Sequence, residues 1–346
     1  VGVKLIEFSQ NGVVRRLNSR DGWNSYWESR MNQPQAVVHS LHRNHVNKVV
    51  LQLPSVGFLE PTDLGHQINQ SDCQTGGEHA AGEILQHFVE RRGQFYAGGI
   101  SSPVTAPSSC SRLSAHLAFG TISIRRVWQA TEQRRSEVKG LAMTEKNQSI
   151  QKQFRRWQKS IQSMQSRLHW HCHFIQKLED EPAIEHRNMW SAANGLREND
   201  FSDRYFQAWK SGCTGYPLVD ACMRSLNKTG WLPFRMRALV VSFASYSLWL
   251  HWRDPGIHLA KSFLDFEPGI HWSQMQMQSG TTGINTLRIY NPTKQAKEQD
   301  SQGTFIRKWI PELVSVPNVF IHTPWMMPAH IQQSSGCTIG SLYPKP

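Results

Sequence analysis

The segment from residue 235 to residue 252 limits the possible folds most, because it carries almost no charge beyond two arginines at its start. Its large apolar residues recur at helical spacing, and a helix that is apolar over most of its surface belongs in a protein core. Arg235 and Arg237 stand at the entrance of this helix. A buried arginine is costly unless it faces an anion or a carboxylate. Asp265 and Glu267 are the obvious carboxylate candidates.

A second buried helix is predicted just before this segment. Gly215 followed by Pro217 suits a turn into the first position of a helix. Gly230 suits the end of that helix, because glycine readily adopts the left-handed conformation beyond a last helical turn. Between them the apolar residues form one stripe, made by Leu218, Cys222 and Leu226. Two buried helices in succession indicate a helical bundle.

Composition points to an anionic partner. The chain has 346 residues, enough for one large domain or two smaller ones, and its formal net charge is +12. Aromatic residues are interleaved with the arginines and lysines, which favours nucleic acid over other anions. An ordinary solvated basic surface is the alternative. Thirteen tryptophans are many for this length, so we expect most of them in the core or facing a cofactor.

Cysteine usage and hydropathy bear on the compartment. Six cysteines are scattered without a CxxC pair, which argues against a disulfide framework and favours a reducing, intracellular (cytoplasmic) location with access to DNA. No run of about 18 apolar residues predicts a membrane span, and no signal peptide is visible. The chain begins with Val1, so we expect a fragment in which the lack of a leader carries little weight.

The N-terminal part has mixed composition. Residues 1–23 predict a short strand, a turn at Asn11 and Gly12, and the entrance to a helix. Residues 24–75 contain three prolines and predict a connection that wraps the surface. Residues 49–51 could add a short strand within it.

The remaining elements follow from periodicity. Residues 78–92 predict an amphipathic helix, and residues 134–153 a polar, variable loop flanked by helix ends. Residues 153–168 predict a basic helix, and residues 181–210 a polar helical segment. The proline-rich end, residues 324–346, is expected on the surface.

The segment from Cys110 to Ser114 opens another predicted helix. Hydroxylated residues at a helix start offer side-chain oxygens and free backbone N–H groups to an anion. Ordinary N-capping is the commoner use of serine and is the alternative interpretation.

A histidine-rich stretch raises the question of a metal. His169 and His173 are four residues apart and share a helix face, with His171 and Cys172 between them. A zinc site needs about four ligands and a supporting shell of hydrogen bonds. No other histidine or cysteine pair stands at metal spacing, so no metal site is predicted.

Several motifs occur together in one order, and that order carries a resemblance. They are TGYPLVDA at 214–221, TGW-x-x-x-R-x-R at 229–237, the acidic loop at 265–267, RIYNPTKQ at 288–295 and FIRKWIPEL at 305–313. The series resembles the FAD-binding region of the photolyase/cryptochrome family. The resemblance implies a mainly all-α fold, with a multi-helical FAD-binding and DNA-binding domain at 76–346. Residues 1–23 would then end a truncated α/β antenna domain, and residues 24–75 would be an interdomain linker.

The resemblance also implies a set of cofactor contacts. The implied FAD-binding residues are Tyr96, Cys110, Ser111, Arg112, Leu113, Ser114, Met164, Arg237, Asp265, Phe266, Glu267 and His271. Residues 110–114 match the family's diphosphate loop, although the family commonly has threonine where Cys110 stands. Met164 replaces a family tryptophan. Arg237 and Asp265 would pair against the flavin, and His271 would face flavin N5, where photolyases usually have asparagine and where histidine could add a pH dependence.

The same resemblance implies a DNA-facing set, namely Arg167, Trp170, His171, Phe234, Arg235, Met277 and Arg288. Trp170 matches a tryptophan that stacks on the damaged dinucleotide. Arg167 and His171 fall where well-known bacterial members have glutamate and arginine. Met277 replaces the second aromatic wall of the pocket, and methionine stacks less specifically than tryptophan.

The implied catalytic residues are Trp252, Arg237 and His271. The family reduces its flavin through three tryptophans, of which only Trp252 has a counterpart here. Asn199 occupies the outer position and Met275 the position nearest the flavin. Other aromatic residues could substitute or could simply be core, namely Trp231, Tyr246, Trp249 and Trp272.

Three functions remain open from the sequence. The first is a monomeric photolyase, which repairs UV-induced pyrimidine dimers in DNA by electron transfer from photoexcited reduced FAD. The second is a cryptochrome-like blue-light photoreceptor that binds FAD without repair. The third is a basic, flavin-free nucleic-acid-binding module. An antenna chromophore and the type of lesion are not identified.

Overall fold

The computed structural model describes residues 12–35, 72–284 and 286–346. Its longer helices are α1 (Trp23–Asn32), α3 (Glu78–Glu90), α7 (Ile124–Thr144), α8 (Gln148–Asp180), α9 (Asp203–Ser211), α10 (Pro217–Thr229), α11 (Phe234–Ser242), α12 (Arg253–Ser262), α13 (Pro268–Ser279) and α14 (Pro292–Gln299). Shorter helices are α4 (Tyr96–Gly99), α5 (Ala106–Ser109), α6 (Ser114–Ala118), α15 (Thr304–Trp309) and α16 (Ala329–Ser335). Single turns are η2 (Arg92–Phe95), η3 (Pro182–Glu185), η4 (Ser191–Ala193), η5 (Phe243–Ser247), η6 (Pro311–Leu313) and η7 (Pro324–Met326). The all-α prediction is confirmed.

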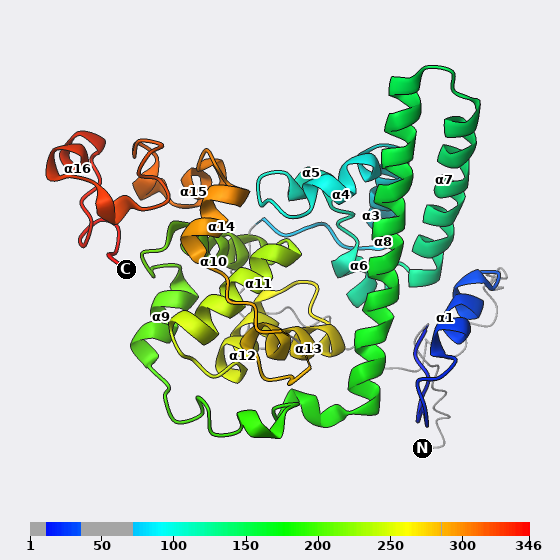
Figure 1. Cartoon of the computed structure of the whole chain (residues 1–346), viewed down its shortest axis with the longest axis horizontal. Coiled ribbons are helices and arrows are strands. Elements are labelled where there is room, and N and C mark those ends of the chain that lie inside the picture. Colours follow the sequence, from blue (N-terminus) through cyan, green and yellow to red (C-terminus); the bar gives the residue numbers. More distant parts are fainter. Residues whose placement is uncertain (1–11, 36–71, 285) are drawn as a thin grey trace, which may run out of the picture.

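The helices form two packed groups joined by α8 (Figure 1). One buried core draws on α10, α11, α12, α13, α15 and the C-terminal segment, and the other on α1, α3, α7 and α8. Gly269, at the start of α13, allows the close approach between the groups. A Cβ atom there would lie 2.6 Å from the Cα atom of Ile175 in α8. The residues predicted to bind FAD come from both groups, with Tyr96, Leu113 and Met164 in the core that includes α8 and Phe266 packed against the other core.

Residues 134–153 form a helical hairpin, so the predicted loop is wrong there. Helix α7 continues to Thr144, and Asn147 caps the start of α8 by accepting hydrogen bonds from two backbone N–H groups. The two helices stand side by side at one edge of the molecule (Figure 1). A small core of Val138, Trp157 and Ile161 holds them together, which explains why a mostly polar sequence is helical here.

The predicted core helix at 235–252 is interrupted. Helix α11 ends at Ser242, a π-helical turn spans Phe243–Ser247, and Trp249 adopts a left-handed φ of 57°. Such π-turns occur mostly as short insertions at functional sites. The apolar run is buried as predicted, but its last part turns toward Trp252 and the start of α12.

The N-terminal segment contributes to the core. Helix α1 begins at Trp23, where the entrance to a helix was predicted, and continues into the predicted connection at 24–75; its Trp23, Trp27 and Met31 are buried. The Trp27 ring lies edge-on to Trp128 of α7, with centroids 4.9 Å apart. This part of the connection is therefore not a surface element. Two predicted strands, one within 1–23 and one at 49–51, lie outside the described residues, as does Asn11 of the predicted turn. Gly12, the other turn residue, has the positive φ, 77°, that such a turn uses.

The C-terminal segment, residues 324–346, lies largely on the surface as expected, and α16 has no buried residue, but a few side chains anchor it to the core. Cys337 and Tyr343 are fully buried. The Tyr343 hydroxyl donates to Asp220 Oδ2 at 2.6 Å, and the same carboxylate accepts from the backbone N–H groups of Thr214 and Gly215. The TGYPLVDA motif thus forms a buried anchor for the C-terminal segment, and the predicted helix behind it runs from Pro217 to Thr229.

Candidate functional site

The Arg237–Asp265 ion pair is the centre of the candidate site. Arg237 lies one turn into α11 and donates to both carboxylate oxygens, at 2.9 and 2.7 Å. Its Nε also donates to the Leu232 carbonyl at 2.8 Å, and the Phe263 ring lies 4.1 Å from the guanidinium carbon. Burial opposes ionisation of Asp265, yet the charge of Arg237 and the hydrogen bonds it receives hold its pKa below the usual value. The predicted pair is present and fully assembled.

The predicted diphosphate loop lies directly beside this pair. Ser114, its last residue, hydrogen-bonds Asp265. Arg112 adopts a left-handed φ of 60°, and its guanidinium lies 3.9 Å from the centre of the Trp231 ring. Strained φ values in residues other than glycine cluster at ligand sites. Arg92 of η2 holds the loop by donating to the Ser111 carbonyl at 2.6 Å.

Positive charge exceeds negative charge around this loop. Arg92, Arg112 and Arg237 all act electrostatically on Cys110, and Asp265 acts on Arg112. Burial raises the pKa of Cys110 to about 11 although the three arginines oppose the rise. Cys110 therefore stays a neutral thiol at pH 7. An excess of guanidinium groups suits a diphosphate, which accepts charge-assisted hydrogen bonds, so these residues fit the phosphate part of FAD.

Tyr96, Leu113 and Met164 lie on the α8 side of the loop. All three are buried in the core that also contains Phe88, whose ring is edge-on to Tyr96 at 5.7 Å. Burial raises the pKa of Tyr96, and Cys110 raises it further. The structure thus brings these residues next to the loop, and their contact with the cofactor stays a prediction.

Phe266, Glu267 and His271 surround the start of α13. His271 is buried, one ring nitrogen lies 2.9 Å from the Gly256 carbonyl, and Phe266 is edge-on at 5.2 Å. Burial lowers the pKa of His271 to about 4, and burial raises the pKa of Glu267. His271 is therefore neutral at pH 7 and donates its ring proton to Gly256. A pH response near neutrality is not expected from this histidine.

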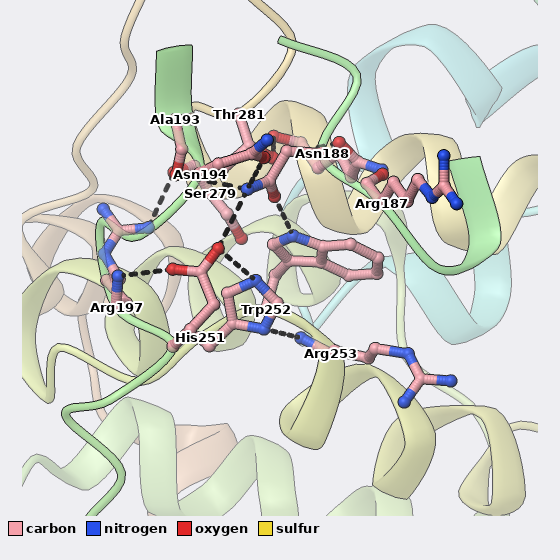
Figure 2. A network of polar contacts seen from close by, with 12 residues as sticks. Arg187, Asn188, Ala193, Asn194, Arg197, His251, Trp252, Arg253, Ser279 and Thr281 are labelled. Carbon is pink, nitrogen blue, oxygen red and sulfur yellow. Dashed lines mark hydrogen bonds and ion pairs between the residues drawn. The ribbon is translucent and has the colours of Figure 1, made fainter. Parts of the chain in front are cut away.

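Trp252 is fully buried and held by a polar network (Figure 2). Its indole N–H donates to Asn188 Oδ1 at 2.7 Å, and the Asn188 amide donates in turn to the Ala193 carbonyl at 3.1 Å. The Trp272 ring lies 6.1 Å from that of Trp252 and 4.8 Å from that of His271. A line of rings therefore leads from Trp252 to the residue assigned to the flavin.

Asn188 was not predicted from the sequence. It is 64 residues from Trp252 in the chain and belongs to a segment without regular structure. No local pattern marks it. Asn199 and Met275, at the other two expected tryptophan positions, are exposed and buried respectively.

The predicted DNA-facing residues fall on two adjoining surfaces. Arg167 of α8 lies 5.7 Å from the ring of Phe234, which is 51% exposed at the start of α11. Trp170 is 46% exposed and tilted against Phe174 at 5.7 Å. Helical spacing puts Arg167, Trp170 and His171 on one face of α8. An arginine thus stands between exposed aromatic rings from two helices.

The other predicted DNA-facing residues have more varied surroundings. Arg235 is half-buried and donates to Gln295 at 3.5 Å. Met277 is half-buried, and Arg288 is exposed beyond α13. Burial lowers the pKa of His171 to about 4, so this residue brings no positive charge at pH 7.

The histidine-rich stretch packs against α1. One ring nitrogen of His169 lies 3.0 Å from Asn24 Oδ1, and the rings of His169 and His173 lie edge-on to Trp23. Across residues 12–35, 72–284 and 286–346 no group of three potential ligands is placed to hold a metal ion. In the same residues, no helix combines the length and the apolar character needed to cross a bilayer.

The loop, the ion pair and the ring-lined start of α13 adjoin one another within one helical domain. The family model for the FAD binding domain of DNA photolyase matches residues 164–346. The chain is 31% identical to a deoxyribodipyrimidine photo-lyase of Agrobacterium fabrum, over 83% of this chain and 56% of that protein. It is also 31% identical to Cryptochrome-2 of Arabidopsis thaliana, over 77% of this chain and 42% of that protein. The chain belongs to the photolyase/cryptochrome family, and its cofactor is FAD.

Solved structures agree with this assignment. A class III photolyase from Agrobacterium tumefaciens superposes with a TM-score of 0.68 at 28% identity, over 79% of this chain and 52% of that one. A Synechocystis cryptochrome superposes with a TM-score of 0.69 at 28% identity, over 81% of this chain and 55% of that one. The chain spans about half the length of these relatives. Photolyases and cryptochromes match about equally well, so identity alone does not separate repair from light sensing.

Proposed function

We propose that this chain, with FAD bound, splits pyrimidine dimers in UV-damaged DNA when it is illuminated. One observation carries the proposal: the exposed contact between Arg167 and Phe234 lies one helical turn from the buried Arg237–Asp265 pair. A nucleobase stacked at that opening would reach the flavin side of α11 over a short distance. Such a position is what light-driven electron transfer between flavin and lesion requires.

The chain positions and tunes the cofactor, while reduced, photoexcited FAD supplies the electron that splits the dimer. Arg237 places a positive charge beside the flavin, and a nearby opposite charge favours an anionic form of a ligand. Asp265 fixes the direction of that guanidinium through two hydrogen bonds. Arg92 and Arg112 neutralise the charge of the diphosphate. His271 is neutral and adds no charge beside the flavin.

The opening suits a flipped dinucleotide. A lesion must leave the base stack before it reaches a buried cofactor, and damaged bases unstack at lower cost. Trp170 and Phe234 present exposed faces for stacking, and each such contact contributes roughly 1–3 kcal/mol. Arg167 and Arg288 lie on the exposed side, where they can neutralise phosphates. Trp252 and Trp272 would carry an electron from the protein to the flavin and keep it reduced.

A cryptochrome-like photoreceptor without repair is the second candidate. It is favoured by the buried Met275 and half-buried Met277 at positions where the family has aromatic rings, and by Asn199 at the outer end of the electron route. The flavin-free module is set aside because the chain contains an FAD-binding domain.

The deciding experiment illuminates the chemically reduced, FAD-loaded protein together with an oligonucleotide that contains one thymine dimer. We expect the dimer to disappear in blue or near-UV light and to persist in a dark sample. The Phe234→Ala variant should bind FAD normally and repair more slowly. If dimers persist under illumination although the flavin spectrum is normal, the repair proposal is wrong and the photoreceptor remains.

A further inference from the structure

A cavity lies on the α8 side of the molecule, beside the predicted diphosphate loop. It has a volume of about 740 Å³ and opens between α3, η2, α4, α5 and the N-terminal half of α8. Its lining includes Arg91, Arg92, Arg156 and Lys159, and within the described part of the chain it includes no carboxylate. We propose that this cavity binds a nucleotide-type ligand, in which one aromatic ring carries a phosphate.

The four cations favour a phosphate. Arg156 and Lys159 are three residues apart and therefore project from the same face of α8. Arg91 faces them from the end of α3, and all three side chains are exposed. Among the residues that the structure describes, no carboxylate forms an ion pair with any of the four. Clustered cations repel one another, and a bound phosphate would relieve that repulsion.

One of these cations also has unused hydrogen-bonding capacity. Arg92 is half-buried, and its Nε is enclosed without a hydrogen-bond partner. A buried donor left unpaired costs free energy. Its NH2 group is already used by the Ser111 carbonyl. Arg92 therefore stands between the two sites, because it donates to the diphosphate loop and also lines this cavity.

The apolar part of the cavity suits a planar ring. Phe95 lines it with 59% of its side chain exposed, and single strands and nucleotides stack on such aromatic faces. Gly98 lines it too, and a Cβ atom there would meet no other atom within 4 Å. The volume falls within the range of about 300–1,000 Å³ that is common for small-molecule sites. An aromatic wall next to clustered cations matches the two halves of a nucleotide.

This cavity borders the predicted flavin site and shares Arg92 with its surroundings, but none of the residues predicted to bind FAD lines it. The neighbouring Tyr96 does not line it and is buried in the core instead. Lys159 precedes Trp170 by 11 residues in α8, which is roughly 16 Å along a helix axis. The exposed aromatic opening and this cavity therefore lie at different positions along the same long helix.

The test titrates the full chain, saturated with FAD, with 5′-GMP and separately with inorganic phosphate, by isothermal titration calorimetry. Guanine is chosen so that the titrant does not mimic the adenosine half of FAD. We expect one GMP per chain, bound at least tenfold more tightly than inorganic phosphate. Arg156→Ala and Lys159→Ala should each weaken GMP binding at least tenfold. Gly98→Trp should do the same by filling the cavity, without a change of charge.

Arg155→Ala is the matched control, because Arg155 is the exposed neighbour of Arg156 and does not line the cavity. It should leave GMP binding unchanged. The helical circular dichroism and the flavin spectrum verify that each variant is folded. The proposal is overturned by absent GMP binding, by equal losses in Arg155→Ala and Arg156→Ala, by normal binding to Gly98→Trp, or by equal affinity for phosphate alone. It is also overturned if only an oligonucleotide binds, which would make this surface a DNA contact.

Discussion

Replacing Arg237 with leucine tests the central ion pair. Asp265 is buried, with 4% of its side chain exposed, and it receives two hydrogen bonds from Arg237. The variant leaves a buried carboxylate without its counter-charge, which costs about 3–5 kcal/mol when one partner of a buried pair is removed. We expect a loss of that size in the free energy of unfolding of the flavin-free protein, measured with urea at pH 7.

The pH dependence gives this prediction a sharper form. In the natural chain the pKa of Asp265 is lowered, so its contribution to stability is present above the pKa of the unfolded chain and is lost as pH falls. In Arg237→Leu the burial of Asp265 is opposed only by its remaining hydrogen bonds, such as that with Ser114, so its pKa rises. The loss in the free energy of unfolding caused by Arg237→Leu should therefore be smaller at pH 5 than at pH 7, because the buried carboxylate takes up a proton. A loss below about 1 kcal/mol, equal at both pH values, would refute the reasoning.

The double variant Arg237→Leu/Asp265→Leu is the control for this experiment. Replacing both partners of a buried pair with apolar residues is often neutral or stabilising, by roughly 1–4 kcal/mol. We expect it to recover most of the stability lost in the single variant, yet to bind FAD more weakly than the natural chain. Normal FAD binding by the double variant would show that Arg237 and Asp265 do not contribute to binding the cofactor.

Three further predictions concern the electron route, the C-terminal anchor and the DNA-facing surface. Trp252→Phe should slow photoreduction of bound FAD at least tenfold with an unchanged dark spectrum, and an unchanged rate would exclude this route. Tyr343→Phe removes a hydrogen bond to a buried carboxylate and should lower the free energy of unfolding by about 1.5–3 kcal/mol in urea titrations; a change within error would contradict the anchor. Arg235→Ala should weaken DNA binding and reduce the slope of log affinity against log salt by about one, whereas an identical slope would exclude a phosphate contact.

Several elements were predictable because they depend on neighbouring residues. Helix α10 begins at Pro217 and ends before Gly230, as the turn signals indicated. Helix α3, from Glu78 to Glu90, follows its amphipathic pattern. A carboxylate partner for the arginines at the mouth of the apolar helix was predicted from the cost of burying them, and the family resemblance implied the particular pair Arg237 and Asp265.

Other features depend on partners that are distant in the chain. The prediction of a loop at 134–153 misses the tip of the hairpin of α7 and α8, because Val138, Trp157 and Ile161 come into contact only after the two helices pack. Similarly, the proline-rich composition predicts a surface location for the C-terminal segment but not its anchor, in which the Tyr343 hydroxyl donates to Asp220, 123 residues away in the chain. The spacing of apolar residues within a short stretch of sequence does not indicate contacts between distant parts of the chain.

The sequence by itself determined the helical class, the family and the identity of the central ion pair, because these depend on local spacing and on the order of short motifs. Only the tertiary structure decided which aromatic rings line up beside Trp252, that Asn188 holds its indole, and that His271 is neutral. Ring contacts, hydrogen-bond partners and burial arise from packing between segments far apart in the chain. A pKa in particular follows from the surrounding solvent and charge, which exist only once the helices have assembled.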